Sequence, residues 1–252
     1  MHVIQSIKNE KVKKWKKLLT KKGREKSGLF LVEGEHLVEE AHRARLIEEL
    51  IITEQFLSRL DSSYLDEYET YQISREVEKV ISDTETPQGI FAVCRQLAKP
   101  VNVTGKRFLL IDAVQDPGNI GTMLRTADAC GIDMVVLGEG CADLYNAKVL
   151  RAAQGSHFHL PIVKGNLYHW LEKLQGMQIP VYGTALENGE VMTVVEPGHP
   201  FALIVGNEGR GVDHKLLAQT TKNLYIPIYG KSESLNVSVA TGILLYYLRG
   251  IE

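Results

Sequence analysis

The 252-residue sequence predicts an α/β protein of two domains. Short stretches rich in Val, Ile and Leu alternate with amphipathic segments, the order of strands and helices in such folds. A stretch with Pro100, Gly105 and no hydrophobic period separates two such series. In the second series the predicted strands end in loops rich in Gly and Asn, where α/β sheets bind ligands. We therefore expect one domain over residues 1–95, a linker over 96–106 and a second domain over 107–252.

The first domain opens with a predicted helix over residues 9–22. Its apolar stripe comprises Val12, Trp15, Leu18 and Leu19. We expect Gly23 to end this helix and residues 22–28 to form a polar, basic loop. Strands are expected over residues 29–32, 50–52, 70–73 and 90–94. Helices are expected over residues 35–44 and from Ser74 onward, with a mixture of helix and loop over 56–65.

Charge is distributed unevenly, although the net charge is only −2. Residues 1–26 contain ten Lys or Arg against two Glu, whereas residues 33–85 contain five basic and fifteen acidic side chains. Many charge runs form only a solvated helix face, but so basic a helix attracts polyanions whatever its fold. We expect it to contact RNA, with Lys22, Arg24 and Lys26 as candidates for phosphate contacts that carry no sequence information.

The composition argues against several other classes of protein. The chain has no apolar run near the roughly 20 residues of a membrane helix, and its N-terminus lacks the apolar core of a signal peptide. Its three cysteines are scattered and form no C-x-x-C pair, which argues for reduced thiols and against structural zinc. We therefore expect a cytoplasmic protein with no membrane partner and no metal.

The second domain begins with a predicted strand over residues 107–114 and a tight turn. We expect Gly118 or Asn119 to cap the following helix and Gly131 to adopt a left-handed conformation after it. A strand–helix–strand unit follows, which predicts a parallel sheet. Further strands are expected over residues 134–137, 158–163, 179–184 and 202–205. Further helices are expected over residues 146–154, 167–174 and 212–219.

Two histidines could suggest a metal site on the expected strand over residues 158–163. His157 and His159 alternate and would therefore face the same side of that strand. A third ligand is not evident, so we interpret both as surface or interface residues.

Residues 226–248 combine a strand, a polar loop and an apolar helix. The strand is expected over residues 225–228 and the helix from about Leu235 to Leu248. Ser234 and Asn236 can cap this helix and leave backbone N–H groups pointing outward. At helical spacing, the expected buried face comprises Val239, Gly242, Ile243, Tyr246 and Tyr247. Taken alone, this stretch needs no function beyond packing.

Three segments, in order, resemble the motifs of the SpoU (TrmH-like) family of RNA 2′-O-ribose methyltransferases. They are DAVQDPGNIGTMLRTADACG from Asp112, ALIVGNEGRGV from Ala202 and SLNVS from Ser234. The resemblance runs from about Arg107 to the end. Less specifically, IQSIKNEKVK, FLVEGEHLVEEA and TPQGIFAV resemble the ribosomal-protein-like RNA-binding domain that often precedes the catalytic domain. The resemblance implies a SPOUT-type parallel sheet with a deep trefoil knot, a rare topology that pattern analysis would not propose. It also implies a homodimer with its active site across the interface.

The expected cofactor is S-adenosylmethionine. The glycines between Gly206 and Gly211 have the wrong offsets for a G-x-G-x-x-G dinucleotide site. A glycine turn after a buried strand still lets a ligand approach the backbone, although most such turns bind nothing. By resemblance, the cofactor residues are Thr184, Ala185, Leu186, Gly206, Asn207, Gly209, Ile226, Ile228 and Leu235. Such a neutral pocket can recognise adenine by stacking and backbone hydrogen bonds.

The resemblance makes Arg125 the central catalytic residue for methylation of a ribose 2′-hydroxyl. Arginine has a pKa above about 12, so we interpret Arg125 as a clamp on the target phosphate that also stabilises the developing alkoxide. A base role assisted by phosphate stays open. Asn119 is expected to cap its helix and orient the substrate or Arg125, and Glu208 to hold Arg125 or the loop. Ser234 and Asn236 complete this catalytic set.

We therefore predict an S-adenosylmethionine-dependent RNA 2′-O-methyltransferase. Ribosomal RNA, as 23S RNA, is the favoured substrate and transfer RNA the alternative, and Arg151 is expected to contact RNA phosphate. A non-catalytic RNA-binding or ribosome-assembly factor is a rival, which the intact catalytic set argues against. A nucleotide-dependent oxidoreductase is a second rival, which the missing dinucleotide fingerprint argues against.

Overall fold

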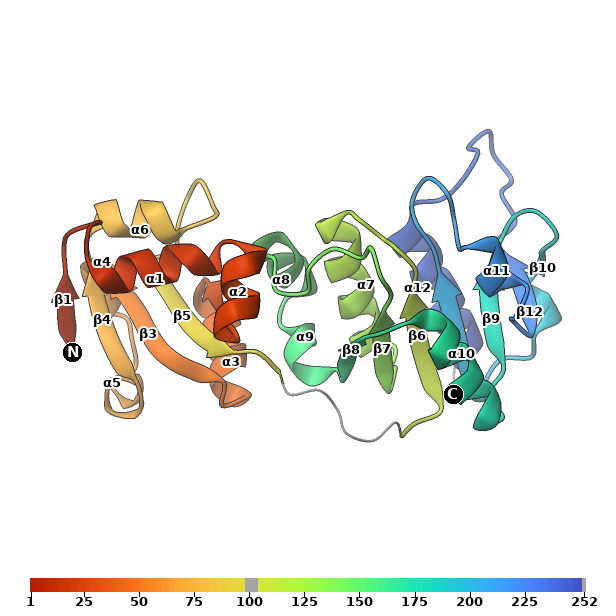
Figure 1. Cartoon of the computed structure of the whole chain (residues 1–252), viewed down its shortest axis with the longest axis horizontal. Coiled ribbons are helices and arrows are strands. Elements are labelled where there is room, and N and C mark those ends of the chain that lie inside the picture. The colour runs from red at the N-terminus through yellow and green to blue at the C-terminus, as the bar shows by residue number, and fades with distance from the viewer. Residues whose placement is uncertain (98–103, 251–252) are drawn as a thin grey trace. The chain divides into compact units, whose positions relative to one another are not determined.

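The computed structural model describes residues 1–97 and 104–250 of the chain (Figure 1). The chain divides into two compact units. The first comprises Met1–Ala98 and Asp143–Phe158, and the second comprises Lys99–Ala142 and His159–Glu252. The segment expected to be a linker, 96–106, lies partly outside the described residues. None of the described helices is long and apolar enough to cross a membrane.

The first unit contains a mixed five-stranded sheet in the order β1-β4-β3-β5-β2. Its strands are His2–Ile4 (β1), Leu29–Glu33 (β2), Ile47–Thr53 (β3), Glu69–Ile73 (β4) and Ile90–Arg95 (β5). β4 runs parallel to β1 and β3, whereas β5 runs antiparallel to β2 and β3. The four predicted strands are confirmed. β1 was not predicted, because three residues are too few to show a period.

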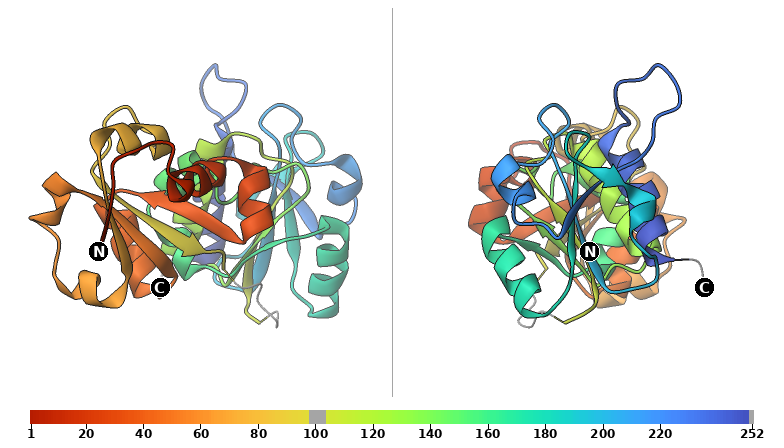
Figure 2. Two further views of the ribbon diagram at one scale, coloured as in Figure 1. Left: turned by 60° about the vertical axis from the view of Figure 1, so that its left-hand side comes forward. Right: turned by 90° about the vertical axis from the view of Figure 1, so that its right-hand side faces the viewer.

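Helices cover both faces of this sheet (Figure 2). They are Glu10–Leu18 (α1), Lys21–Ser27 (α2), Glu35–Arg43 (α3), Glu54–Leu57 (α4), Ser63–Glu67 (α5), Arg75–Ile81 (α6) and Ala147–Ala153 (α8). Successive strand residues point to opposite faces. Ile51 and Phe91 pack with α1 and α6, whereas their neighbours Leu50 and Ala92 pack with α3, α4 and α8.

The basic N-terminal segment folds as two helices, so the predicted loop over residues 22–28 is wrong. Thr20 begins α2 by accepting a hydrogen bond from the Gly23 N–H at 3.1 Å. Gly23 therefore lies inside a helix, where a Cβ atom would come within 1.9 Å of the Lys17 carbonyl oxygen. Gly28 ends the helix with φ +69°. Leu19, expected in the apolar stripe, is exposed.

Arg24 is buried, which contradicts its expected role as a phosphate contact. Its Nε and Nη2 atoms donate to Asp143 Oδ2 at 3.0 and 2.6 Å, and its Nη1 donates to the Leu18 carbonyl at 2.7 Å. These bonds occupy the guanidinium inside the first unit. Lys22 and Lys26 point outward on the same helix and stay candidates for RNA contact.

The second unit contains seven parallel strands in the order β10-β12-β9-β11-β6-β7-β8, which confirms the predicted parallel sheet. Its strands are Arg107–Ile111 (β6), Met134–Leu137 (β7), Ile162–Lys164 (β8), Val181–Thr184 (β9), Glu190–Val191 (β10), Phe201–Val205 (β11) and Lys222–Tyr225 (β12). β12 ends at Tyr225, so the strand expected over residues 225–228 is wrong. Pro227 lacks the N–H that a continuing ladder needs.

The expected strand over residues 158–163 is also wrong, because Ser156–His159 forms a short helix (α9) before β8. The two histidines therefore do not alternate on a strand. His157 is fully buried, which contradicts its interpretation as a surface residue. His159 is exposed and lies with Nδ1 2.9 Å from Asp128 Oδ2. Among the described residues, no group of three or more His, Cys, Asp or Glu could hold a metal ion.

Helices also flank both faces of the second sheet. They are Pro117–Ala129 (α7), Leu167–Gly176 (α10), His214–Leu217 (α11) and Val237–Arg249 (α12), with a 3₁₀ turn at Met192–Val194. α10 and α11 pack on one face, whereas α7 and α12 pack together on the other. Asp116 caps α7 by accepting from the Asn119 N–H at 2.9 Å, so the predicted cap at Gly118 or Asn119 is wrong. Gly131 has φ +69°, as predicted.

The buried face of α12 is the opposite of the one predicted. Its buried residues are Ser238, Thr241, Leu244, Leu245 and Leu248. Val239, Ile243 and Tyr246, expected inside, are exposed. Apolar residues occupy most of this helix, so periodicity alone does not identify the buried side.

The Arg24–Asp143 pair yields a prediction about stability. Arg24→Met should lower the free energy of unfolding by about 3 kcal/mol, because it takes the cation away from the largely buried Asp143 carboxylate. Adding Asp143→Leu should restore part of this loss, and the exposed neighbour variant Lys22→Met should change little. Urea unfolding measures the free energy of unfolding of the Arg24→Met variant, the double variant and the Lys22→Met variant. Equal stability of the Arg24 and Lys22 variants would contradict a structural role for the pair.

Candidate functional site

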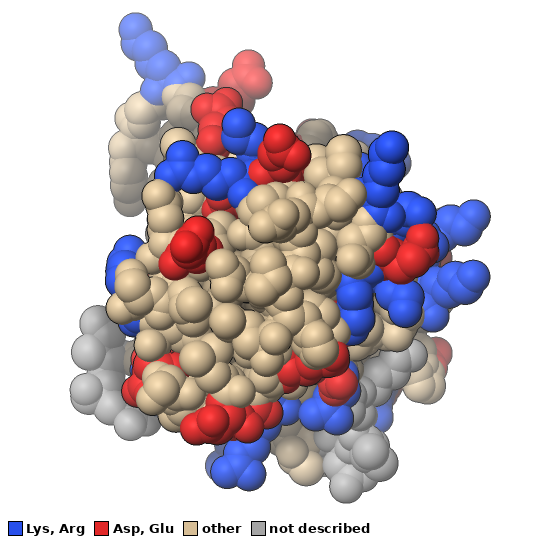
Figure 3. Space-filling view, turned by 90° about the vertical axis from the view of Figure 1, so that its left-hand side faces the viewer, with Lys and Arg blue, Asp and Glu red and all other residues tan. Residues whose placement is uncertain are grey.

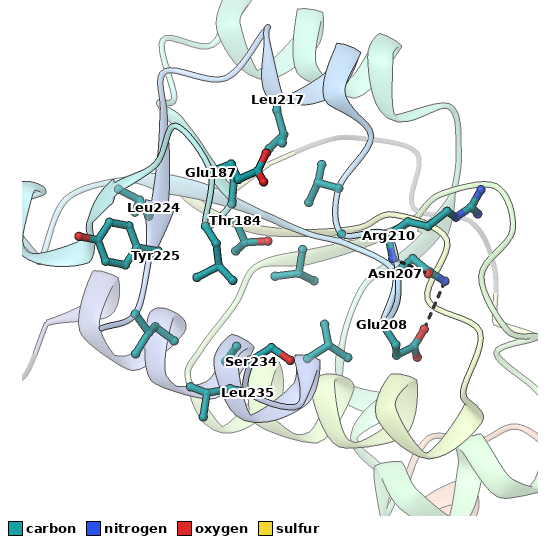
Figure 4. Close-up of a pocket in the computed structure, with 18 of the residues that line it drawn as sticks. Thr184, Glu187, Asn207, Glu208, Arg210, Leu217, Leu224, Tyr225, Ser234 and Leu235 are labelled. Atoms are coloured by element: carbon teal, nitrogen blue, oxygen red, sulfur yellow. Dashed lines mark hydrogen bonds between the residues drawn. The ribbon is translucent and has the colours of Figure 1, made fainter. Parts of the chain in front are cut away.

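A pocket of about 620 Å³ lies at the carboxyl ends of β9, β11 and β12 (Figure 4). Its volume lies within the roughly 300–1,000 Å³ of small-molecule sites. The loops after these three strands and the start of α12 line it. From the strand ends and these loops come Thr184, Ala185, Leu186, Glu187, Asn188, Val205, Asn207, Glu208, Gly209, Arg210, Gly211, Val212, Leu224, Tyr225, Ile226 and Ile228. From α11, the segment before α12 and α12 itself come His214, Leu217, Glu233, Ser234, Leu235, Val237, Ala240 and Leu244.

The structure brings most of the predicted cofactor residues together in this pocket. Those that line it are Thr184, Ala185, Leu186, Asn207, Gly209, Ile226, Ile228 and Leu235. Gly206 does not line it. A Cβ atom on Gly206 would lie 2.1 Å from both the Gly211 carbonyl carbon and the Val212 nitrogen. Gly206 therefore permits the tight return of the chain that forms one wall.

Asn207 fixes the turn that forms this wall. Its backbone exchanges two hydrogen bonds with Gly211, at 3.0 and 2.9 Å. Its side-chain oxygen accepts from the N–H groups of Gly209 and Arg210, and its Nδ2 donates to the Ala113 carbonyl at 2.9 Å. The Arg210 side chain extends away from the enclosed space (Figure 4). The turn is therefore a preformed surface rather than a loose loop.

A chain of polar side chains runs beside the pocket and joins the three sequence motifs. Asn119 Nδ2 donates to Glu208 Oε1 at 3.1 Å, and Asn236 Nδ2 donates to Asn119 Oδ1 at the same distance. Ser238 Oγ donates to Asn236 Oδ1 at 2.5 Å. Asn119 therefore links the turn after β11 to the beginning of α12. Ser238 was not predicted.

Glu208 anchors the loop before α7. Its carboxylate accepts from the N–H groups of Gln115 and Asp116, at 3.4 and 3.2 Å, as well as from Asn119. Partial burial would raise the pKa of Glu208, but these hydrogen bonds and that of its own backbone N–H outweigh it and lower the pKa below its ordinary value. Glu208 is therefore an ionised acceptor near neutral pH. It holds the loop, one of the two roles predicted for it, rather than Arg125.

The two predicted caps of α12 differ in their contacts. Asn236 caps the helix, since its Oδ1 accepts from the N–H groups of Ser238 and Val239 at 2.9 and 3.4 Å. Ser234 does not cap the helix but lines the pocket, and its carbonyl accepts a hydrogen bond from Ser232 at 2.8 Å.

Arg125 lies on α7 with an exposed side chain and does not line the pocket. It is six residues from Asn119, so at about 100° per residue its side chain leaves a different face of the helix. Its side chain makes no hydrogen bond or ion pair with any other described residue. Within one chain, the predicted catalytic arginine therefore stands apart from the polar chain. Arg151 belongs to the first unit and pairs with Asp83 at 3.0 Å.

Several pocket residues were not predicted. Glu187 and Asn188 continue the loop after β9, and their neighbours Thr184 to Leu186 were already indicated. Leu244 comes from α12, and it could not be predicted while the buried face of that helix was assigned wrongly. Outside the pocket, the cap of α7 at Asp116 was overlooked although Pro117 follows it, and proline favours the first position of a helix.

A parallel sheet with a closed glycine turn, a pocket at its strand ends and a bridging asparagine defines a cofactor-binding α/β protein. The chain belongs to the SpoU rRNA methylase family, whose model matches residues 106–246. A model of the MRM3-like substrate binding domain matches residues 9–92. The family predicted from the three motifs is thereby confirmed.

Individual relatives cover nearly the whole chain. It is 51% identical to the 23S rRNA (guanosine(2553)-2′-O)-methyltransferase RlmP of Bacillus subtilis, over 99% of this chain and all of that protein. The AdoMet-bound rRNA methyltransferase from Sinorhizobium meliloti superimposes with a TM-score of 0.88 at 27% identity, covering 98% of this chain and 97% of the other. A TrmH-family structure from Porphyromonas gingivalis gives a TM-score of 0.86 at 35% identity, covering 97% and 98%.

The lowered pKa of Glu208 yields a prediction about pH. A carboxylate whose pKa is depressed by folding contributes stability above its ordinary pKa of 4.5 and loses it as the pH falls through the folded value. Glu208→Gln should therefore be less stable than the wild type at pH 7, and the gap should narrow below about pH 4.5. Thermal unfolding from pH 3 to 7 measures the gap, with Glu233→Gln at the same pocket as the control. A gap that does not change with pH would contradict this role.

Proposed function

We propose that the chain transfers a methyl group from S-adenosylmethionine to the 2′-hydroxyl of a guanosine ribose in 23S ribosomal RNA. The observation that carries the proposal is the polar chain from Glu208 through Asn119 to Asn236 beside a pocket of about 620 Å³. The Bacillus subtilis relative, which matches along its whole length, bears this activity in its name. Transfer RNA stays the alternative substrate.

The pocket has the chemistry that S-adenosylmethionine requires. Val205, Leu224 and Leu244 offer apolar walls for adenine, and Glu187 and Glu233 offer negative charge to a cationic ligand. When bound, the cofactor supplies an electrophilic methyl group on a sulfonium. The lining residues predicted from the sequence would hold it, with Gly206 acting through the shape of the turn. The Sinorhizobium meliloti structure, described as AdoMet bound, supports this choice of cofactor.

The chain's own residues would align the ribose hydroxyl and stabilise its oxygen, with the proton passing to water as the oxygen attacks the methyl group. Arg125 would hold the target phosphate and stabilise the oxygen as it loses its proton, since arginine is a fixed cation with a planar fork. Asn119 and Asn236 would orient the nucleotide. Glu208, already ionised and holding the loop, serves as an anchor. Ser234 would contact ligand from the pocket wall.

We also propose a homodimer whose active site combines residues of both copies. Arg125 lies outside the pocket of its own chain, so a second copy would have to bring it to a cofactor. The exposed apolar residues Val239, Ile243 and Tyr246 on α12 are suited to such an interface. The same proposal includes three further features: the trefoil knot implied by the resemblance, the division into domains over residues 1–95 and 107–252, and the cytoplasmic location.

The first unit would bind the RNA through its basic helices. α1 and α2 expose Lys13, Lys14, Lys16, Lys17, Lys22 and Lys26. In Figure 3, which faces this unit, Lys and Arg side chains gather along one side. Exposed lysines attract phosphate without reading sequence, so they would position the substrate. Arg151 would join them by exchanging Asp83 for a phosphate.

Methyl transfer tests the reaction and the role of Arg125. The wild type should transfer labelled methyl from S-adenosylmethionine to unmodified 23S rRNA, at a ribose 2′-oxygen. Arg125→Ala should lower kcat by about 100-fold or more, because it removes the charge that stabilises the developing alkoxide. Arg125→Lys keeps the charge without the fork and should recover only part of the rate.

Lys173→Ala, which removes an exposed cation on α10, is the matched control for this assay. Unmodified transfer RNA is the competing substrate. Transfer to transfer RNA alone would select the alternative substrate. Cofactor binding without transfer to either RNA would favour the non-catalytic factor.

Sedimentation tests the dimer. Ile243→Glu places a charge in the exposed apolar face of α12 and should convert dimers to monomers. Met177→Glu, at a residue of similar exposure after α10, should leave the dimer intact. If the Ile243 variant sediments as the wild type does, the α12 interface is wrong.

A further inference from the structure

A second cavity, of about 360 Å³, lies in the first unit. It is built by the end of β3, α4, α6 and the segment that leads into β5. The lining residues on which its chemistry depends are Gln55, Arg59, Arg75, Glu78, Lys79 and Gly89. All of them fall within the part of the chain matched by the substrate-binding model. Its size suits a ligand about as large as one nucleotide.

The floor of the cavity is rigid backbone. The Thr53 N–H donates to the Gly89 carbonyl at 2.8 Å, and Gly89 has φ +81°. A Cβ atom on Gly89 would lie 2.5 Å from Thr53 Oγ1 and 3.4 Å from Phe56 Cβ. Glycine is therefore required where this loop meets β3. The Gln88 side chain fixes the loop further by accepting from the Glu35 N–H at 3.1 Å.

Two cationic side chains on α6 line this cavity. Arg75 and Lys79 are four residues apart on α6 and so share one side of the helix. Both side chains are exposed and act electrostatically on Glu78, but neither makes a hydrogen bond or salt bridge with another residue that the structure describes. Arg59 differs, since its guanidinium lies 5.3 Å from the centre of the Phe56 ring and 3.3 Å from Glu35. The cavity thus has two cations free of salt bridges and one held over an aromatic ring.

Glu78 lies between the two free cations in sequence and is only partly exposed. Burial raises the pKa of Glu78 and nearby Glu33 raises it further, and together they outweigh Arg75, Lys79 and a hydrogen bond from the Gly89 backbone, which lower it. A carboxyl group with this environment gains from a ligand that donates hydrogen bonds to it. Guanine and cytosine present such N–H donors on their edges.

We propose that this cavity binds a single unpaired nucleotide of the substrate RNA. Arg75 and Lys79 would contact its phosphate, Glu78 would accept from its base edge, and the guanidinium of Arg59 would offer a stacking plane. Proteins read RNA in this way, by splaying out unpaired bases and contacting their edges and faces. The inference rests on the proposed function, because it takes RNA as the substrate. It adds a recognition site remote in sequence from the three catalytic motifs.

Binding to unmodified 23S rRNA tests the cavity independently of catalysis. Gln55→Trp fills the mouth without changing charge, and Ser58→Trp places the same bulk on an exposed neighbour that does not line the cavity. Arg75→Ala/Lys79→Ala removes the two free cations. Lys14→Ala/Lys17→Ala removes the same charge from α1.

The dissociation constant for RNA should rise about tenfold or more in Gln55→Trp and in the Arg75/Lys79 double variant. Ser58→Trp should bind as the wild type does, and affinity for S-adenosylmethionine should be unchanged throughout. The α1 double variant should weaken binding to paired and unpaired RNA alike. By contrast, the cavity variants should affect a hairpin with an unpaired nucleotide more than its fully paired counterpart.

Equal RNA binding by Gln55→Trp and Ser58→Trp would overturn the proposal. Guanosine monophosphate that binds the cavity as tightly as RNA would also overturn it, because the ligand would then be a free nucleotide. Failure of the proposed function would be a separate result. If the wild type binds RNA but transfers no methyl group, the binding of the variants can still be compared.

Discussion

The second unit depends on one asparagine side chain that acts as donor and acceptor at once. Asn119 donates to Glu208 after β11 and accepts from Asn236 at the start of α12. Segments 89 and 117 residues away are thereby joined beside one pocket. This is feasible because β6 and β11 are adjacent and parallel, so the loops that follow them emerge at the same edge. An aspartate at this position would accept from Asn236 but would repel Glu208 instead of donating to it.

The sheet could be predicted because its evidence is local. Buried strands such as residues 202–205, and the glycine turn that follows them, can be recognised from the sequence. The parallel arrangement follows from the helices between successive strands. The proposed catalytic residues came from motif resemblance, but the hydrogen bonds between them could not be predicted in that way. Nothing in the sequence indicates that Glu208 bonds the loop before α7 rather than Arg125, because that choice depends on side-chain directions in the folded chain.

Two of the errors share a physical cause, which is that contacts with distant parts of the chain decided between similar local patterns. Arg24 looked like its exposed neighbours, but its partner Asp143 lies 119 residues further along the chain. α12 is apolar on most sides, and packing against α7 rather than periodicity selected its buried face. The error at Gly23 has a local cause instead: Thr20 caps a second helix, and the close approach of Lys17 requires a residue without a side chain.

The different contacts of Glu208 and Arg125 bear on how the ribose hydroxyl loses its proton in the proposed reaction. Glu208 is ionised, but its carboxylate is already occupied by two backbone N–H groups and Asn119. A base must have a free lone pair within reach of the hydroxyl, and a carboxylate whose pKa is lowered by such bonds is a weak one. Arg125 has the opposite character, exposed and without a partner among the described residues. Charge stabilisation by Arg125 therefore suits this geometry better than proton abstraction by Glu208. In the proposed dimer, Arg125 of one copy would hold the substrate phosphate next to the cofactor pocket of the other copy.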